Sequence, residues 1–157
     1  MKYLFVSVGK ERDDLFGDAV DEFSRRISRY VSFSWKVLQQ SKRGSKDGAE
    51  IAMREEGEAI LRVLEPGDCV IVLDEHGKEL SSVELSELFE KKTNEGIKRM
   101  VFIIGGAYGI SDAVKQKANL TWSLSRLTFP HQLARLVLTE QTYRALSILA
   151  NEKYHHE

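Results

Sequence analysis

Three segments in the last third of the chain carry residues that could bind a small molecule and act on it chemically. A glycine turn at residues 105–109 directly follows the apolar run 101–104, and a loop at 124–129 ends at Pro130. The tail ends in Tyr154, two histidines and a glutamate. Glycines let a ligand approach the backbone closely, and an imidazole titrates near pH ~6.5 and can move a proton. The order of these segments predicts a cofactor cradle with a mobile polar tail beside it.

The glycine turn alone leaves two interpretations open, a structural turn or a cofactor cradle. It is not the dinucleotide pattern G-x-G-x-x-G, and it lacks the Lys-Ser/Thr pair of a phosphate loop. The loop at 124–129 favours the cradle, because turns after Leu73, at Gly105-Gly106 and along this loop can together offer backbone and apolar groups to an adenine. No Lys or Arg cluster accompanies the glycines, so the sequence favours a cofactor without phosphates, commonly S-adenosylmethionine. A β-branched residue at Gly106 is expected to fill the ligand's space and remove binding.

Strands and helices alternate along the chain. The pattern predicts strands at 2–8, 33–37, 69–73, 100–104 and 121–124, a turn at 74–78, and helices at 13–30, 46–64, 81–92, 111–118 and 131–151. The strands at 69–73 and 100–104 are apolar on both faces, which is typical of a parallel sheet covered by helices on each side. With no linker or repeat, we expect one α/β domain spanning residues 1–157.

Composition excludes several classes of protein. Of 157 residues, 42% are hydrophobic and 30% charged, as in ordinary globular proteins, and no apolar run approaches the ~18 residues of a membrane span. The first apolar run is followed at once by charges, which indicates a strand and not a signal peptide. The single cysteine, Cys69, predicts a buried thiol in a reducing cytoplasm. No His/Cys/Asp cluster has metal-ligand spacing, so no metal is predicted.

A net charge of −1 does not indicate a nucleic-acid binder, because such proteins usually carry a basic field. Any RNA contact must therefore use local positive charge. The candidates are Arg25, Arg26 and Arg29 on one predicted helix, and Lys42-Arg43 with Lys46 in a loop. Each group is more often an ordinary solvated face, so composition leaves RNA possible and unproven.

Motifs spread over the whole chain resemble the bacterial ribosomal large-subunit methyltransferase H family. They are Val6-Ser-Val-Gly-Lys10, Leu73-Asp74 with Gly77-Lys78, Phe102-Ile-Ile-Gly-Gly106 with Gly109, Ser123-Leu-Ser-Arg-Leu-Thr-Phe-Pro-His131, Glu140-Gln-x-Tyr-Arg-Ala145 and Tyr154-His155. The resemblance implies a SPOUT-type fold with a C-terminal trefoil knot, a homodimer, and S-adenosyl-L-methionine as cofactor. It also implies methylation of N3 of a pseudouridine in large-subunit (23S) ribosomal RNA.

The resemblance also implies which residues bind the cofactor. They are Leu73, Gly105, Gly106, Leu124, Ser125, Arg126, Leu127, Thr128 and Phe129. The chain departs from its relatives in the tail, where His156 stands in place of an Arg or Lys and would weaken a phosphate contact. Ala107-Tyr108 lies where relatives vary, and implies no change of cofactor.

The same resemblance points to the C-terminal residues for catalysis. N3 of a pseudouridine is protonated near neutrality, so a base must remove the proton or the site must stabilise the anion. His155 is the candidate general base. Tyr154 could stack on the pseudouridine ring or hydrogen-bond to it, and Arg144 could bind a phosphate or stabilise the developing negative charge. Roles outside catalysis stay open: Arg144 could form a surface ion pair, and His155 could simply be an exposed residue of the tail. His76 and His131 are expected to be structural or loop residues.

The predicted helix at 131–151 carries an apolar stripe too wide for one sheet face, so part of it is expected to bury against a second copy. The tail is expected to reach the partner subunit's pocket. The low net charge favours an RNA presented by an assembled ribosome in the cytoplasm. The alternatives are a SPOUT-like methyltransferase of another RNA such as tRNA, or a non-catalytic ribosome-binding protein.

Overall fold

A five-stranded parallel sheet with the strand order β2-β1-β4-β3-β5 organises the computed structural model, which describes residues 1–9, 15–42 and 48–156. The strands are β1 (Lys2–Val8), β2 (Ser32–Leu38), β3 (Cys69–Glu79), β4 (Arg99–Ile104) and β5 (Leu120–Ser123). The helices are α1 (Gly17–Ile27), α2 (Ala49–Leu61), α3 (Ser82–Asn94), α4 (Asp112–Lys115) and α5 (His131–Leu149).

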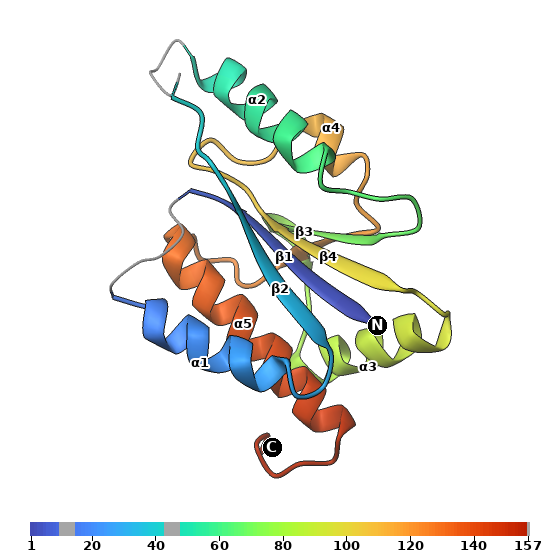
Figure 1. Ribbon diagram of the computed structural model, residues 1–157. Coiled ribbons are helices and arrows are strands. Elements are labelled where there is room, and N and C mark those ends of the chain that lie inside the picture. Colours follow the sequence, from blue (N-terminus) through green and yellow to red (C-terminus); the bar gives the residue numbers. More distant parts are fainter. Residues whose placement is uncertain (10–14, 43–47, 157) are drawn as a thin grey trace.

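Helices cover both faces of this sheet, which confirms the predicted α/β class. Figure 1 shows α2 and α4 on one face and α1, α3 and α5 on the other. Alternate residues of a strand point to opposite faces, so β4 supplies Phe102 to the core under α3 and α5 and Ile103 to the core under α2 and α4. Both side chains are fully buried, as expected for a central strand. Cys69, predicted to be buried, is buried with a free thiol.

The parallel register brings the ends of several strands to one edge of the sheet. Ile103 of β4 pairs with Val72 of β3, so the glycine turn after β4 and the residues after Leu73 emerge side by side. β5 pairs with the other side of β3, and its carboxyl end lies at the same edge. Open α/β sheets bind ligands at this edge, which makes it the place to look for a site.

The predicted turn at residues 74–78 is wrong, because β3 continues to Glu79. Leu73 and Lys78 both pair with Trp122, so residues 74–77 form an irregularity within the strand and pairing resumes after it. Gly77 permits this course, since a Cβ there would lie 2.6 Å from the backbone oxygen of Thr121. The bulge turns Asp74, Glu75 and His76 toward the ligand edge of the sheet.

The helix boundaries largely follow local sequence. Ser81 caps α3: its Oγ accepts the N–H of Glu84 at 3.1 Å, and the Glu84 carboxylate accepts the N–H of Ser81 at 2.7 Å. α1 ends at Ile27, three residues earlier than predicted, because residues 28–30 form a turn. The predicted starts at residues 13 and 46 lie outside the described residues. Within the described ranges, no helix is both long and apolar enough to cross a membrane.

Candidate functional site

A cavity of about 550 Å³ opens at the carboxyl edge of the sheet, a volume in the usual range for small-molecule sites. Its walls are residues 73–76 of β3, the turn after β4 and the loop after β5. Eight of the nine predicted cofactor positions line it, namely Leu73, Gly105, Gly106, Leu124, Ser125, Leu127, Thr128 and Phe129. The ninth, Arg126, is exposed and is not part of the lining.

The glycine turn is held tightly by its own backbone and by the protein behind it. The N–H of Gly109 donates to the carbonyl of Gly106 at 3.0 Å, and the φ of +89° at Gly109 is one that residues with a side chain rarely adopt. A Cβ on Gly106 would collide with the carboxylate of Glu56, away from the cavity. The expectation that a side chain at residue 106 would fill the ligand's space is therefore wrong, because the Cβ would point to Glu56 behind the turn and not into the cavity.

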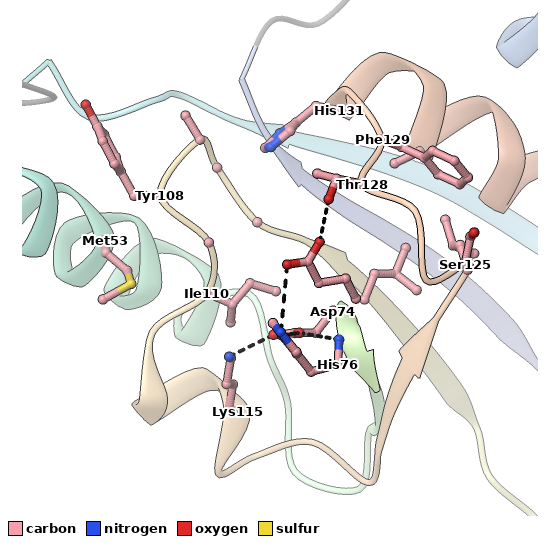
Figure 2. A pocket seen from close by; sticks show the side chains of 18 of the residues that line it. Met53, Asp74, His76, Tyr108, Ile110, Lys115, Ser125, Thr128, Phe129 and His131 are labelled. Carbon is pink, nitrogen blue, oxygen red and sulfur yellow. Dashed lines mark hydrogen bonds and ion pairs between the residues drawn. The ribbon is translucent and has the colours of Figure 1, made fainter. Parts of the chain in front are cut away.

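The loop at 124–129 is fixed by short polar contacts. The hydroxyl of Ser123 donates to the carbonyl of Ser125 at 2.8 Å, and the N–H of Leu127 donates to the Ser125 hydroxyl at 3.0 Å. The Thr128 hydroxyl donates to Glu75 at 2.8 Å, which ties this loop to the β3 bulge across the cavity (Figure 2). The loop thus has a defined shape although three of its residues, Arg126, Leu127 and Thr128, are exposed.

The β3 bulge adds charged groups that the sequence did not predict to be part of the site. Figure 2 shows Asp74 between Lys115 and His76: Lys115 Nζ lies 2.7 Å from Oδ2, and the backbone N–H of His76 donates to Oδ1 at 2.9 Å. Burial acts to raise the pKa of Asp74, but Lys115 and the His76 N–H outweigh it and hold the pKa below its usual range. Asp74 is therefore ionised at neutral pH and balances the only lysine or arginine that lines the cavity within the described chain.

His76 and His131, expected to be structural or loop residues, both line the cavity, as do Met53 of α2 and Ile110. The position of residues 74–76 directly after an apolar strand was a usable indication, since the strand ends share one edge. Met53 comes from a helix distant in the sequence, and no local pattern could have placed it there.

Comparison with known proteins places this chain. The family model described as "Predicted SPOUT methyltransferase" matches residues 1–155. The chain is 47% identical over its whole length to the whole of a Porphyromonas gingivalis protein named ribosomal RNA large subunit methyltransferase H. It is 44% identical, with the same full coverage, to the protein of that name from Parabacteroides distasonis.

The chain belongs to the SPOUT methyltransferases. The resemblance stated from the motifs is thereby confirmed, and the relatives assign the chain to the methyltransferase H branch of that family. A solved structure of a probable methylase family protein from Haemophilus influenzae shares the fold, with a TM-score of 0.52, 11% identity, and coverage of 99% of this chain and 70% of that one.

The C-terminal tail of this SPOUT methyltransferase packs back on its own helix α5. The Tyr154 hydroxyl donates to Glu140 at 3.0 Å, and the Arg144 guanidinium lies 4.7 Å from the centre of the Tyr154 ring. His155 Nδ1 lies 3.4 Å from the same guanidinium. Burial, and then the hydrogen bond to Glu140, raises the pKa of Tyr154, so its phenol keeps its proton. The three predicted catalytic residues therefore form one cluster.

This cluster lies far from the cavity of the same chain. The cavity lining on α5 ends at Ala134, and Arg144 is 10 positions further along, about 15 Å away at 1.5 Å per residue. Figure 1 shows the C-terminus beyond the opposite end of α5 from its first turn. The structure thus brings together the predicted cofactor positions, and separately the predicted catalytic residues, but does not bring the two groups to each other.

The remaining predictions concern metals and RNA. No group of three or more His, Cys, Asp or Glu side chains suited to a metal ion occurs among the described residues. Arg25 and Arg26 both pair with Glu22 on α1, and Arg26 also lies over the Tyr143 ring. Lys42 is exposed, whereas Arg43 and Lys46 lie outside the described residues.

Proposed function

We propose that this methyltransferase transfers a methyl group from S-adenosylmethionine to N3 of a pseudouridine in large-subunit (23S) ribosomal RNA. The observation that carries the proposal is the convergence of Leu73, the Gly105-Gly106 turn and the loop at 124–129 on one cavity. The name that relatives at 44–47% identity carry supports ribosomal RNA as the substrate. The single domain and the trefoil knot implied by the resemblance are part of the same proposal.

The cavity suits a cofactor that has no phosphates. Leu73, Leu124 and Ile110 offer apolar contacts for an adenine ring, and the turns offer backbone groups for its edge. Lys115 is already paired with Asp74, so it is not available to neutralise a pyrophosphate. When bound, S-adenosylmethionine supplies an electrophilic methyl group on sulfur, and the cavity walls orient it for in-line attack.

Two copies of the chain would complete one active site. Along α5, the end of the cavity lining at Ala134 and the tail cluster at Arg144 are about 15 Å apart. A twofold dimer that places the tail of one protomer over the partner's cavity would bring them together. Apolar α5 side chains that stay only half-buried in the single chain, among them Leu133, Leu136 and Ile148, support such an interface.

Within that composite site the tail residues would handle the proton. His155 would accept the N3 proton, which turns the neutral nitrogen into a nucleophile. Tyr154 would hold the pseudouridine ring, either by stacking on it or through a hydrogen bond from its hydroxyl. Arg144 is bound to Glu140 at 2.6 Å and lies against both tail residues, so it would hold them in place in addition to stabilising negative charge.

The substrate is proposed to be the assembled ribosome in the cytoplasm. With a net charge of −1, and with Arg25 and Arg26 paired internally, the chain gains little from the phosphates of free RNA. A shaped ribosomal surface would supply the missing affinity. The competing outcomes are methylation of tRNA and binding to the ribosome without methyl transfer.

The test is mass analysis of 23S ribosomal RNA from cells with and without the protein, followed by transfer of labelled methyl to ribosomes, free ribosomal RNA and tRNA. We expect one methylpseudouridine to be lost in the deleted strain and restored only on ribosomes. Labelling of tRNA would favour the other RNA substrate, and binding to ribosomes without transfer would favour the non-catalytic protein.

Calorimetry tests the cofactor directly. We expect S-adenosylmethionine and its demethylated product to bind between micromolar and millimolar concentration, and neither NAD nor ATP to bind. Tight binding of NAD or ATP would contradict the assignment of the cavity.

A further inference from the structure

The loop from Gly105 to Ser111 docks on α2 through two matching contacts, each with a polar side chain opposite a glycine. At the first, the Glu56 carboxylate of α2 lies against Gly106 of the loop, where any Cβ would collide with it. At the second, the Ser111 hydroxyl lies against Gly57 of α2, where a Cβ would collide with that hydroxyl. The loop from Gly105 to Ser111 therefore packs against one turn of α2 near both of its ends.

Glu56 is an unusual residue for this position. It is 3% exposed, and its Oε1 accepts the backbone N–H of Ser41 at 3.0 Å. Its Oε2, which faces Gly106, has no hydrogen-bond partner among the described residues, and neither has the Ser111 hydroxyl. Burying a carboxylate oxygen without a partner lowers stability, so stability alone does not account for a glutamate here.

The position of the carboxylate relative to the cavity offers the reason. One side of the Gly105-Gly106 turn lines the cavity, and the other side rests on Glu56. A shift of the turn would change the wall that the cofactor meets. The contact with Ser41 in turn anchors the carboxylate to the segment that follows β2, so that Glu56 is held from both sides.

We propose that Glu56 is a positioning residue for cofactor binding, which holds the Gly105-Gly106 turn in its ligand-binding shape from behind. The inference rests on the proposal that S-adenosylmethionine occupies the cavity in front of this turn. Glu56 does not touch the cofactor in this arrangement. Its effect passes through the backbone of Gly106, and it depends on the size of the side chain and on its acceptor for the Ser41 N–H.

The experiment measures S-adenosylmethionine affinity by calorimetry for the wild type, Glu56→Ala, Glu56→Gln and the control Glu58→Ala. Glu58 is exposed on the same helix and away from the cavity lining. We expect Glu56→Ala to weaken binding about tenfold or more, the scale of a slightly misplaced site. Glu56→Gln keeps the size and the acceptor, so it should stay within about threefold, and Glu58→Ala should match the wild type.

Steady-state kinetics separates positioning from general destabilisation. For Glu56→Ala, KM for S-adenosylmethionine should rise while kcat at saturating cofactor stays close to the wild type. A lowered melting temperature with unchanged affinity and KM would make Glu56 a purely structural residue and overturn the inference. A wild type that does not bind S-adenosylmethionine would instead reject the cavity assignment itself, together with everything built on it.

A second pair of variants guards against a failure of Glu56→Ala to fold. Gly106→Ala introduces the methyl group that collides with the carboxylate, and should weaken binding while Glu56 is present. Adding Glu56→Ser makes room for that methyl, so the double variant should bind more tightly than Gly106→Ala alone. If it binds no more tightly, the contact between the two residues does not set the turn, and the inference fails.

Discussion

The hydroxyl of Tyr154 donates a hydrogen bond to Oε1 of Glu140 at 3.0 Å, which fastens the C-terminal tail to the helix that precedes it. Arg144 bonds the same carboxylate oxygen at 2.6 Å and lies over the Tyr154 ring. The tail is thus packed against α5, although the sequence predicted it to be mobile. Through these contacts α5 carries cavity-lining residues at its first turn and the candidate catalytic residues near its end.

Removal of the tail is the first prediction. A chain ending at Lys153 should fold, dimerise and bind S-adenosylmethionine, because the cavity lining ends at Ala134. Methyl transfer to ribosomes should fall by about 10² or more, the scale of losing a general base. His155→Ala should lose as much or less, and its pH–rate profile should lose one limb. Full activity of the truncated chain would leave Arg144 as the leading candidate.

Subunit mixing tests the composite site. His155→Ala in the tail and Gly106→Val in the cavity should each be strongly impaired alone. After subunit exchange, half of the dimers carry both variants, and each has one site with an intact cavity and an intact partner tail. About a quarter of wild-type activity should return. No recovery, or a monomer by sedimentation at micromolar concentration, would contradict the dimeric arrangement.

The third prediction concerns Gly106 itself. Gly106→Val should abolish S-adenosylmethionine binding, because the new side chain collides with Glu56 and drives the turn forward. Calorimetry measures the loss, and far-UV circular dichroism checks that the fold persists. Gly96→Val on the opposite edge is not a suitable control, since its φ of +77° strains any side chain. Ala113→Val is a better control, because Ala113 is exposed on α4 and does not line the cavity. Retained binding there would show that the loss is specific to residue 106.

A buried ion pair predicts how stability varies with pH. Arg99 at the start of β4 bonds both carboxylate oxygens of Asp68 at 2.6 and 2.7 Å, and only 4% of the Asp68 side chain is exposed. Burial acts to raise the pKa of Asp68, but the Arg99 guanidinium outweighs it and holds the pKa below its usual range. The stabilisation is therefore present above the unfolded pKa of ~3.9 and is lost as pH falls through the lower folded value.

Asp68→Asn should lower the free energy of unfolding at neutral pH by about 3 kcal/mol, because it leaves the Arg99 charge without its main partner. It should also flatten the decline in stability below pH ~4, since the titrating group is gone. Urea unfolding of both proteins across this range measures the two effects. Parallel curves for variant and wild type would show that Asp68 does not contribute to acid sensitivity.

The N-cap of α3 gives a prediction in which the stability of the fold changes and cofactor affinity does not. Ser81→Ala removes the hydroxyl that accepts the Glu84 N–H, and should cost about 1 kcal/mol. Neither residue lines the cavity, so cofactor affinity should not change. A loss of affinity would mean that α3 and the cavity are coupled in a way that their separation in the fold does not suggest.

Local sequence determined the class of fold, and the family resemblance of its motifs predicted most residues of the cavity. The apolar runs at 69–73 and 100–104 predicted buried parallel strands, and the helix predicted to begin at residue 81 begins at Ser82, directly after its cap Ser81. The resemblance carried by the motifs from Leu73 to Phe129 implied nine cofactor positions, and eight of them line one cavity. The strand and helix predictions succeeded because hydrophobic period and helix ends are properties of a few neighbouring residues.

Tertiary structure decided what joins distant segments. The contact of Glu56 with Gly106, the bridge from Thr128 to Glu75, and the pairing of Lys115 with Asp74 each connect elements that are remote in sequence. They depend on sheet order and on the bulge in β3, which no local spacing encodes. The length of α5 likewise separates the tail from the cavity of its own chain. That separation is a matter of geometry in three dimensions, because a rigid helix of 19 residues holds its two ends about 27 Å apart.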